Sequence, residues 1–377
     1  MNAIYLDNAA TTNIHPEVIA VMQTSMAENF GNPSSTHQFG RKAKATVETA
    51  RKNIAKHFNA SAAEIIFTSS GTEADNLILH NAVLNLGVTR IITSKIEHHA
   101  VSHTCDFLQK SENVTIAYVA LDVFGNIDML HLETLLKASK VKTLVSLMMI
   151  NNEIGNILEM GEISNLCKLN NALFHSDTVQ VIGHYKIDLQ TTLVDFMVAS
   201  AHKFHGPKGV GFAFFRKGFG ILPMLHGGDQ EKGARSSTEN VHAILGMEKA
   251  LEIAHTVLEE DKSYIENLKV YFIAKLKKLS GGIQFNGLSE DLEKSSYTIL
   301  SVRFPVQNDM LLFSLDLAGI AVSGGSACQS GSNKGSHVLS EILKNGEEDK
   351  TSIRFSFSKF TKKKDIDFTI SKLQELL

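Results

Sequence analysis

The chain has 377 residues, of which 43% are hydrophobic and 20% are charged, and its formal net charge at pH 7 is -3. This balance is typical of a globular protein with room for two or three domains, and it gives no reason to expect a nucleic acid or an anionic membrane as partner. The three cysteines are widely spaced without a CxxC pair, which excludes a disulfide framework and a zinc cage of cysteines. The first residues lack the basic start and apolar core of a signal peptide, and no apolar run approaches the about 20 residues of a membrane span. We therefore expect a cytoplasmic protein without membrane contact.

Seven short apolar runs alternate with longer amphipathic stretches in the first two thirds of the chain. The runs cover residues 64–69, 90–94, 114–121, 142–150, 172–177, 193–200 and 210–215. Strands separated by helical patterns predict an α/β fold with a mostly parallel seven-stranded sheet. Such sheets bind ligands at the carboxyl ends of their strands, so the polar residues that follow each run are the candidates for a functional site.

The pattern changes after about residue 255. Ile265, Leu268, Phe272 and Leu276 recur at helical spacing, which predicts a long helix leading into a second domain. Strand-like runs at 297–304 and 351–357 flank a stretch rich in glycine and serine at 322–336. We expect a large α/β domain over residues 14–255, and a smaller α+β domain formed by residues 1–13 and 256–377.

The first two strand ends present hydroxyl groups and histidines. Gly71 and Thr72 open a helical pattern after the first run, where backbone N–H groups suit a phosphate, although such residues can also simply cap the helix. The second run is followed by His98 and His99, with His103 four residues after His99. That spacing suits a metal ion, but no further ligand type clusters with it, so we favour a stacking or surface role and expect no metal.

The later strand ends add an amide, a carboxylate and a lysine. Asn152 follows the fourth run, Asp177 and Gln180 follow the fifth, and Lys203 follows the sixth. Polar side chains that cluster after buried strands need hydrogen-bond partners. Their number here therefore favours a bound ligand that provides those partners. A phosphate cradle, a ring stacker, a carboxylate for a pyridinium proton and a reactive amine together fit pyridoxal 5'-phosphate (PLP), which bonds covalently to a lysine.

Ordered motifs along nearly the whole chain extend this interpretation. They read YLDNAATT, FGNPSSTHQFG, FTSSGTEADN, EHHAV, NNEIG, HSDTVQ, SAHKFHGPKGVG, HGGDQEKGARSST, SGGSAC and SIRFSFSKFT. In this order the motifs resemble the cysteine desulfurases of the NifS/IscS type, which belong to the class V aminotransferase superfamily and have the PLP-dependent transferase fold of type I. The resemblance implies that fold, with an active-site cysteine loop in the smaller domain.

The resemblance also implies roles around the cofactor ring. Lys203 would bond to the cofactor aldehyde, and His98 would stack on the ring and assist proton transfer. Asp177 would pair with the ring nitrogen, while Asn152 and Gln180 would contact the side of the phenolic oxygen.

Further roles concern the phosphate and the substrate. The phosphate would be held by Gly71, Thr72, Ser200 and His202. Thr238 would reach the same phosphate from a neighbouring subunit, which implies a homodimer. Arg354 would bind the carboxylate of L-cysteine, helped by Asn32, although an arginine in a strand can equally serve a structural ion pair.

The expected reaction converts L-cysteine to L-alanine and leaves a persulfide on Cys328. A thiol in a loop rich in glycine and serine is free of apolar burial, whereas Cys105 and Cys167 fall on helical patterns and are expected to be small core residues. The persulfide would pass to a sulfur-accepting protein, for iron-sulfur cluster assembly or thio-modification. Cys328 could also be a passive loop thiol.

Two alternatives stay open from the sequence. A selenocysteine lyase or another class V amino-acid lyase would keep the cofactor residues and use Cys328 differently. Outside enzymes, the chain could be a sulfur-carrier or assembly platform that kept the fold and lost turnover, although Lys203, Asp177, His98 and Cys328 together argue against this.

Overall fold

The seven apolar runs form one sheet in the computed structural model, which describes residues 3–279, 281–324 and 335–377. Its strand order is β2-β8-β7-β6-β5-β3-β4, and β8 alone runs antiparallel to its neighbours within this sheet. The prediction of a mostly parallel seven-stranded sheet is therefore confirmed. The strands are β2 (Ile65–Thr68), β3 (Arg90–Thr93), β4 (Thr115–Tyr118), β5 (Thr143–Ser146), β6 (Leu173–Ser176), β7 (Phe196–Ser200) and β8 (Gly211–Phe215).

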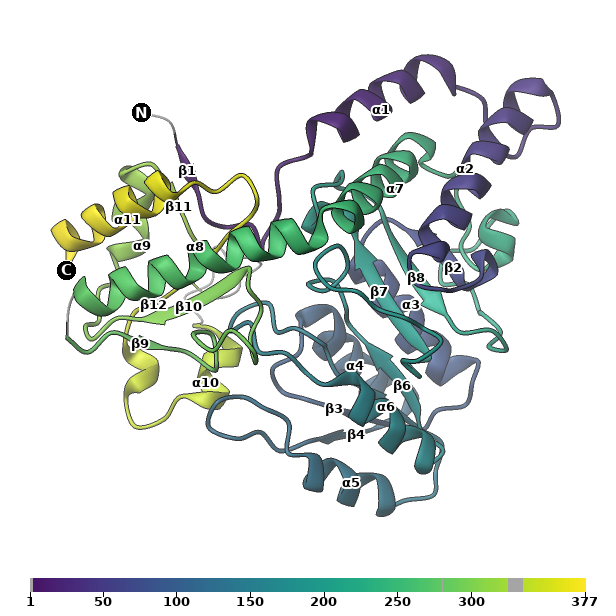
Figure 1. The fold of residues 1–377 in the computed structure, drawn as a ribbon. Coiled ribbons are helices and arrows are strands. Elements are labelled where there is room, and N and C mark those ends of the chain that lie inside the picture. Colours follow the sequence, from purple (N-terminus) through teal and green to yellow (C-terminus); the bar gives the residue numbers. More distant parts are fainter. Residues whose placement is uncertain (1–2, 280, 325–334) are drawn as a thin grey trace.

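Helices cover both faces of this sheet, so the central strands are buried on two sides (Figure 1). Successive residues such as Ile91 and Ile92 enter two different hydrophobic cores, as the alternation of side chains along a strand requires. One face packs on α3 (Gly71–Leu84) and α4 (His99–Glu112). The other face packs on α2 (Gln38–Lys56), α5 (Met129–Lys137), α6 (Met160–Leu169) and α7 (Val241–Thr256). Helix α1 (Pro16–Glu28) lies against α7.

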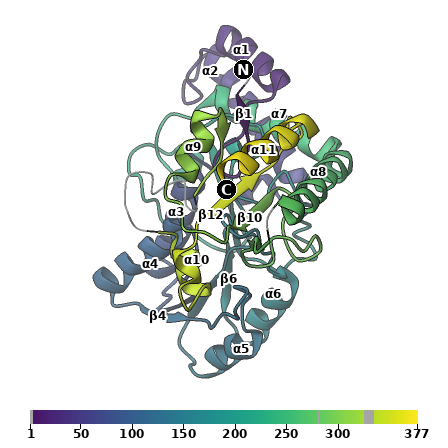
Figure 2. The same ribbon diagram turned by 90° about the vertical axis from the view of Figure 1, so that its left-hand side faces the viewer.

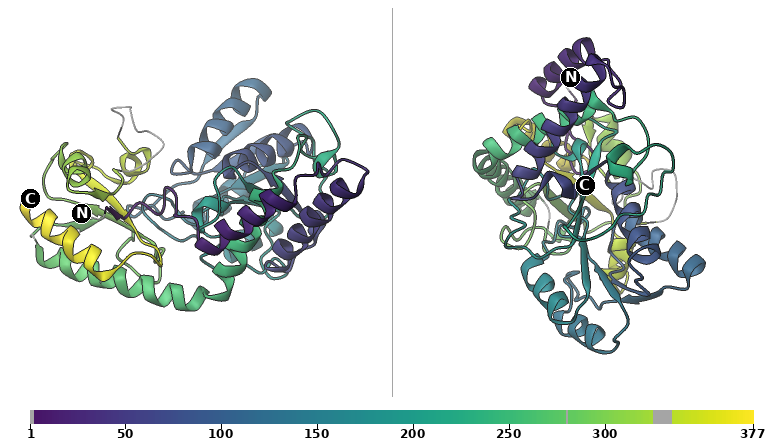
Figure 3. Two further views of the ribbon diagram at one scale, coloured as in Figure 1. Left: turned by 90° about the horizontal axis from the view of Figure 1, so that it is seen from above. Right: turned by 90° about the vertical axis from the view of Figure 1, so that its right-hand side faces the viewer.

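A separate core forms around the predicted long helix, which is α8 (Leu258–Leu279). Ile265, Leu268, Phe272 and Leu276 are buried in this core, as their spacing predicts. Seen from above, α8 runs along one side of the molecule and joins the two halves, and both chain ends lie in the half formed by the second core (Figure 3). That core includes β9 (Gln284–Phe285), β10 (Ile299–Arg303), α9 (Leu311–Leu317), β12 (Ser352–Ser356) and α11 (Lys363–Leu376).

The N-terminal residues belong to the second core rather than to the large sheet. Strand β1 (Ile4–Tyr5) pairs in parallel with β11 (Ile320–Ala321), and Ile4 and Leu6 pack in the core of α8. The short helix α10 (His337–Ile342) extends from this half and lies beside α4 (Figure 2). The grouping of residues 1–13 with 256–377 stays a prediction.

Two further expectations concern cysteines and membranes. Cys105 on α4 and Cys167 on α6 are buried free thiols, as expected for small core residues, and burial raises the pKa of Cys105 to about 12. Such a thiol stays protonated and unreactive. Among the described residues, no helix combines the length and the apolar character needed to cross a bilayer.

Candidate active site

A cavity of about 240 Å³ lies at the carboxyl ends of the parallel strands. It gathers most of the predicted site residues from motifs far apart in the sequence. These are Gly71, Thr72, His98, Asn152, Asp177, Gln180, Ser200, His202, Lys203 and Arg354. The cavity is also lined by Asp75, which the sequence analysis did not assign a role.

The start of α3 forms one wall of the cavity. Ser70 caps the helix by accepting a hydrogen bond from Glu73 N, so the Gly71 and Thr72 N–H groups are the ones that the helix itself leaves without acceptors. A Cβ added at Gly71 would lie 2.5 Å from Val179 Cγ2, so this position admits only glycine without a shift of the neighbour. The helix start thus provides N–H donors and a hydroxyl in a tight cradle suited to a phosphate.

His98 is placed by its role as the N-cap of α4. Its Nδ1 accepts a hydrogen bond from Ala100 N at 3.1 Å, which holds the imidazole ring at the N-terminal end of the helix. Burial lowers the pKa of His98 below its ordinary value, although the Asp177 carboxylate opposes that shift. A neutral imidazole in a fixed orientation is suited to stacking on an aromatic ring and to accepting a proton.

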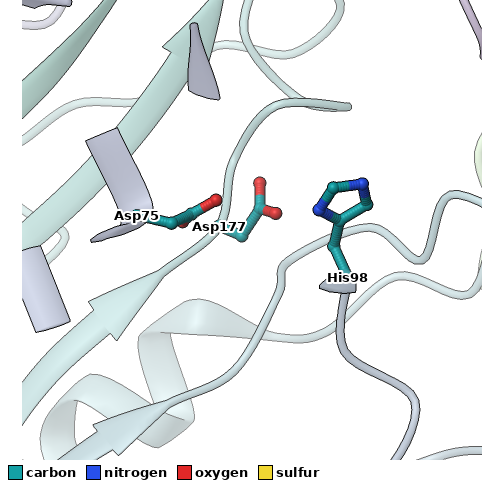
Figure 4. Close-up of side chains that lie close together, drawn as sticks. All are labelled: Asp75, His98 and Asp177. Atoms are coloured by element: carbon teal, nitrogen blue, oxygen red, sulfur yellow. The ribbon is translucent and has the colours of Figure 1, made fainter. Parts of the chain in front are cut away.

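Asp177 follows β6 and lies close to two other titratable side chains. Single ligand atoms of Asp75, His98 and Asp177 all lie within 4.8 Å of one another, and Figure 4 shows the Asp177 carboxyl between the other two in that view. Asp177 accepts a hydrogen bond from Val179 N at 2.9 Å, which orients its carboxylate. Three such groups could hold a metal ion, but burial raises the pKa of Asp75 well above its ordinary value, and a protonated carboxyl is a poor ligand.

Lys203 lies on a short helical turn (Ala201–Lys203) directly after β7. Its Nζ donates hydrogen bonds to the carbonyls of Ala9 and Ala10, at 2.6 and 2.9 Å. Gln180 also donates to the carbonyl of Ala9, at 3.0 Å. The N-terminal YLDNAATT motif therefore holds the lysine amine and the glutamine amide at the cavity.

His202 precedes the lysine and contacts the same N-terminal motif. Its Nδ1 lies 3.1 Å from Thr11 Oγ1. Burial first, and then the charges of Lys203 and Lys208, lower the pKa of His202 to about 4. The side chain is therefore a neutral hydrogen-bonding group on the cavity wall at neutral pH.

Arg354 on β12 reaches the cavity from the second core. Its Nη1 donates to the carbonyl of Asn152 at 2.7 Å, and its Nη2 lies 2.8 Å from Asp7 Oδ1. Its Nε is buried and has no hydrogen-bond partner among the described residues. The structural ion pair that the sequence left open is therefore present.

Three predicted residues are not placed in the cavity. Asn32 is exposed in the segment between α1 and α2, where it accepts from Ser34 N. Thr238 is exposed and lines a different cavity of its own chain, with Ser69, Gly209 and others. Cys328 lies outside the described residues.

The sequence analysis missed Asp75 and Asp7. Asp75 falls on the apolar stripe of α3 with Ile78, Leu79 and Ala82, where a carboxylate is out of place. A charged residue on a buried helical stripe is the sequence signal that could have found it. Asp7 gave no such signal, because its partner Arg354 lies 347 positions away.

The donor set fits PLP by its chemistry. A cradle that only a glycine permits and an unpartnered buried Arg354 Nε are features that a phosphorylated, carboxylate-bearing ligand would satisfy. The imidazole, the carboxylate and the amine at the other walls match a ring face, a ring nitrogen and an aldehyde.

Comparisons with known proteins agree with this site. The model of the aminotransferase class-V family matches residues 4–368. The cysteine desulfurase IscS of Dictyoglomus turgidum is 40% identical over 379 residues, covering 99% of this chain and 94% of the relative. The cysteine desulfurase IscS of Methanosarcina thermophila is 38% identical over 378 residues, covering 100% of this chain and 92% of the relative.

Solved structures give the same result. The structure of a NifS-like protein superposes with a TM-score of 0.90 at 36% identity, covering 99% of both chains. A structure of SspA in complex with cysteine superposes with a TM-score of 0.78 at 28% identity, covering 95% of this chain and 100% of the other. The chain therefore belongs to the class-V aminotransferase family, a family of PLP-dependent enzymes, and within it to the cysteine desulfurases of the NifS/IscS type.

Proposed function

We propose that this cysteine desulfurase holds PLP through Lys203 and transfers the sulfur of L-cysteine to Cys328, with L-alanine as the other product. The observation that carries the proposal is the single cavity shared by Lys203, Asp177, His98 and the start of α3. These groups come from four segments of the chain, and their chemical types match the phosphate, the ring and the aldehyde of the cofactor.

Each side chain of the cavity would have its own role in the proposed reaction. Lys203 would hold the cofactor, and its amine would accept and return the proton at the substrate Cα. The Asp177 carboxylate would pair with the ring nitrogen, and neutral His98 would cover the ring face and accept a proton. Arg354 orients the substrate by its carboxylate through Nε. PLP bound there supplies an electron sink that makes the Cα proton removable.

The sulfur step requires a second nucleophile, which we assign to Cys328. Its thiolate attacks the substrate sulfur, an S–S bond forms and the Cβ–S bond breaks. The electron pair of the broken bond stays with the carbon fragment, which is protonated to alanine.

Residues on both sides of the segment that contains Cys328 are anchored beside the cavity. Ser323 N and O bond with Arg354 O and N at 3.2 and 2.7 Å, and His337 Nε2 lies 2.9 Å from the carbonyl of Glu97.

The short separation in sequence between the anchored residues and Cys328 supports the assignment. Cys328 is four residues from Gly324 in the sequence. Four residues span at most about 14 Å between Cα atoms when fully extended, and this short separation in sequence is the support that the assignment has from chain length.

We further propose a homodimer and a protein acceptor. Thr238 is exposed and lies outside the cavity of its own chain, which supports its contribution to the phosphate site of a partner subunit. The persulfide on Cys328 would be passed to an acceptor thiol on a sulfur-accepting protein.

The test is alanine and sulfide production from L-cysteine with a reducing thiol present. Wild-type protein loaded with PLP should be yellow and should form both products. Lys203→Ala should lose the yellow absorbance and both products. Cys328→Ala should keep the absorbance and lose both products, and mass spectrometry after alkylation should find the persulfide on Cys328 of the wild type.

A matched control is Cys167→Ala, which removes a buried thiol and should keep both products. Alanine release that survives Cys328→Ala would favour a lyase. A wild-type protein that takes up PLP but forms no product would favour the non-catalytic platform.

A further inference from the structure

Asp7 forms an ion pair with Arg354, one of the side chains that line the active-site cavity. The Asp7 carboxylate accepts a hydrogen bond from Arg354 Nη2 at 2.8 Å. The arginine side chain is 2% exposed and the aspartate side chain 18%, so the pair is largely removed from water. Asp7 belongs to the YLDNAATT motif, and the function proposed above gives its side chain no role.

Backbone contacts hold Asp7 in place independently of this ion pair. Asp7 forms a β-bridge with Ser356 on β12, two residues after Arg354. On either side of the bridge, Ser356 N donates to the carbonyl of Leu6 at 2.7 Å, and Ala9 N donates to Ser356 Oγ at 2.9 Å. The fold therefore places the Asp7 carboxylate beside the guanidinium, and a change of the side chain alone leaves this backbone in place.

Asp7 is the anionic partner of the Arg354 guanidinium. Its Nη1 donates to the carbonyl of Asn152 at 2.7 Å, and that acceptor is neutral. Its Nε is buried and has no hydrogen-bond partner among the described residues. Among the ion pairs that the described residues form, the one of Arg354 is with Asp7. The charge of this arginine is thus already shared with an acid of the same chain before a ligand binds.

A ligand carboxylate at Arg354 would meet the Asp7 carboxylate across the same guanidinium. Each carboxylate oxygen lies about 3 Å from its nitrogen in such a hydrogen bond, so the two anions are separated by no more than about 8 Å. At an effective dielectric constant of about 20, repulsion between unit charges at that distance weakens binding by about 30-fold. Because Asp7 is partly exposed, solvent screens part of this repulsion, and an effect of about tenfold remains.

We propose that Asp7 determines how tightly the site holds a carboxylate: its charge offsets that of Arg354, so that L-cysteine and L-alanine bind about tenfold more weakly than they would to an arginine without an acidic partner. This inference rests on the proposed function, which places the amino-acid carboxylate at Arg354. Substrate and product carry the same carboxylate, so Asp7 lowers the affinity for both alike and promotes the dissociation of L-alanine after each turnover.

The test separates the charge of Asp7 from its hydrogen bond. Asp7→Asn keeps an oxygen that can accept from Arg354 Nη2 but carries no charge, whereas Asp7→Ala removes both. The ligands are L-alanine and ethylamine, which has the same amine but no carboxylate, and neither has a sulfur to transfer. Their dissociation constants for the PLP-loaded enzyme are measured from the absorbance of bound PLP. The readout is the ratio of the two constants, in which effects on the amine cancel.

We expect Asp7→Asn to shift this ratio about tenfold in favour of L-alanine. Asp7→Ala should shift it in the same direction but less, because the guanidinium also loses one of its two fixed acceptors. The matched control is Asp261→Asn, which removes an acid paired with Lys359 outside the cavity and should leave the ratio unchanged.

A ratio in Asp7→Asn that is unchanged, or shifted against L-alanine, would overturn the proposal and leave Asp7 as a structural anchor of Arg354. Should Asp7→Asn fail to fold, the proposal requires the shift in Asp7→Ala. The proposed function has its own check in Arg354→Lys. If that variant keeps the ratio of the wild type, the carboxylate does not bind at Arg354, and the assignment of the substrate site fails instead.

Discussion

Arg354 Nη2 lies 2.8 Å from Asp7 Oδ1, and this contact joins the last strand of the second core to the N-terminal segment that also holds Lys203. The arginine side chain is only 2% exposed. Arg354 thus connects segments from the two ends of the chain, and its Nε has no hydrogen-bond partner among the described residues.

We expect Arg354→Lys to raise KM for L-cysteine by about 10- to 100-fold, because an ammonium cannot replace the planar fork of a guanidinium against a carboxylate. The absorbance of bound PLP should be retained. Steady-state kinetics check this, with Arg303→Lys as control, since Arg303 bonds with Asn286 outside the cavity. Loss of thermal stability with an unchanged KM would show that Arg354 is only structural.

His98 caps α4, and we expect it to have a second, separable role at the cofactor ring. His98→Ala should lower the free energy of unfolding by about 1 kcal/mol, because the N-cap of α4 is lost, and His98→Asn should restore most of it. Both variants should lose activity by about 100-fold or more, because an amide neither stacks on the ring nor exchanges a proton with it. Urea unfolding and alanine production measure the two effects, and His103→Asn on the exposed side of α4 is the control. An active His98→Asn enzyme would contradict the assignment.

The buried ion pair between Arg51 and Glu231 anchors the segment that carries Thr238. Arg51 donates to both carboxylate oxygens at 2.6 and 2.7 Å, and both side chains are at most 3% exposed. Arg51→Met should destabilise the protein by about 3–5 kcal/mol, because Glu231 is left buried without its partner. Lys186→Met removes the exposed pair with Glu259 and should change stability by about 0–1 kcal/mol. Urea unfolding compares the two, and equal effects would refute the argument.

Lys269 on α8 predicts a pH dependence of stability. Its Nζ is buried and donates to Ser295 Oγ and to the carbonyl of Ser296, and burial lowers its pKa from 10.5 to about 7. Between these values the unfolded chain binds one proton more than the folded protein, so this group makes stability rise with pH from about 7 toward 10.5. The slope is at most about 1.4 kcal/mol per pH unit.

Lys269→Met should remove that slope. Urea unfolding at pH 7, 8 and 9 gives the difference between wild type and variant, in which the contributions of all other groups cancel. The control is Lys275→Met, which removes an exposed lysine of the same helix. A difference that does not grow with pH would contradict a neutral buried Lys269.

Local patterns predicted the elements that local interactions form. The seven apolar runs became the seven strands of the sheet, and the stripe of Ile265, Leu268, Phe272 and Leu276 became the buried face of α8. Strand ends were less predictable. The run at 142–150 continues to residue 150, but β5 ends at Ser146, and Met148 and Ile150 line the cavity instead of continuing the strand.

The sequence by itself determined the fold class, the family and the chemical types of the side chains that line the cavity, because these depend on periodicity and on motifs whose residues are neighbours in the chain. Only the tertiary structure decided which of these groups share one cavity, that Ala9 and Ala10 hold the Lys203 amine, and that Asp7 pairs with Arg354. Those contacts join residues separated by about a hundred positions or more. Their geometry and their charge states follow from burial, which exists only once the chain is folded.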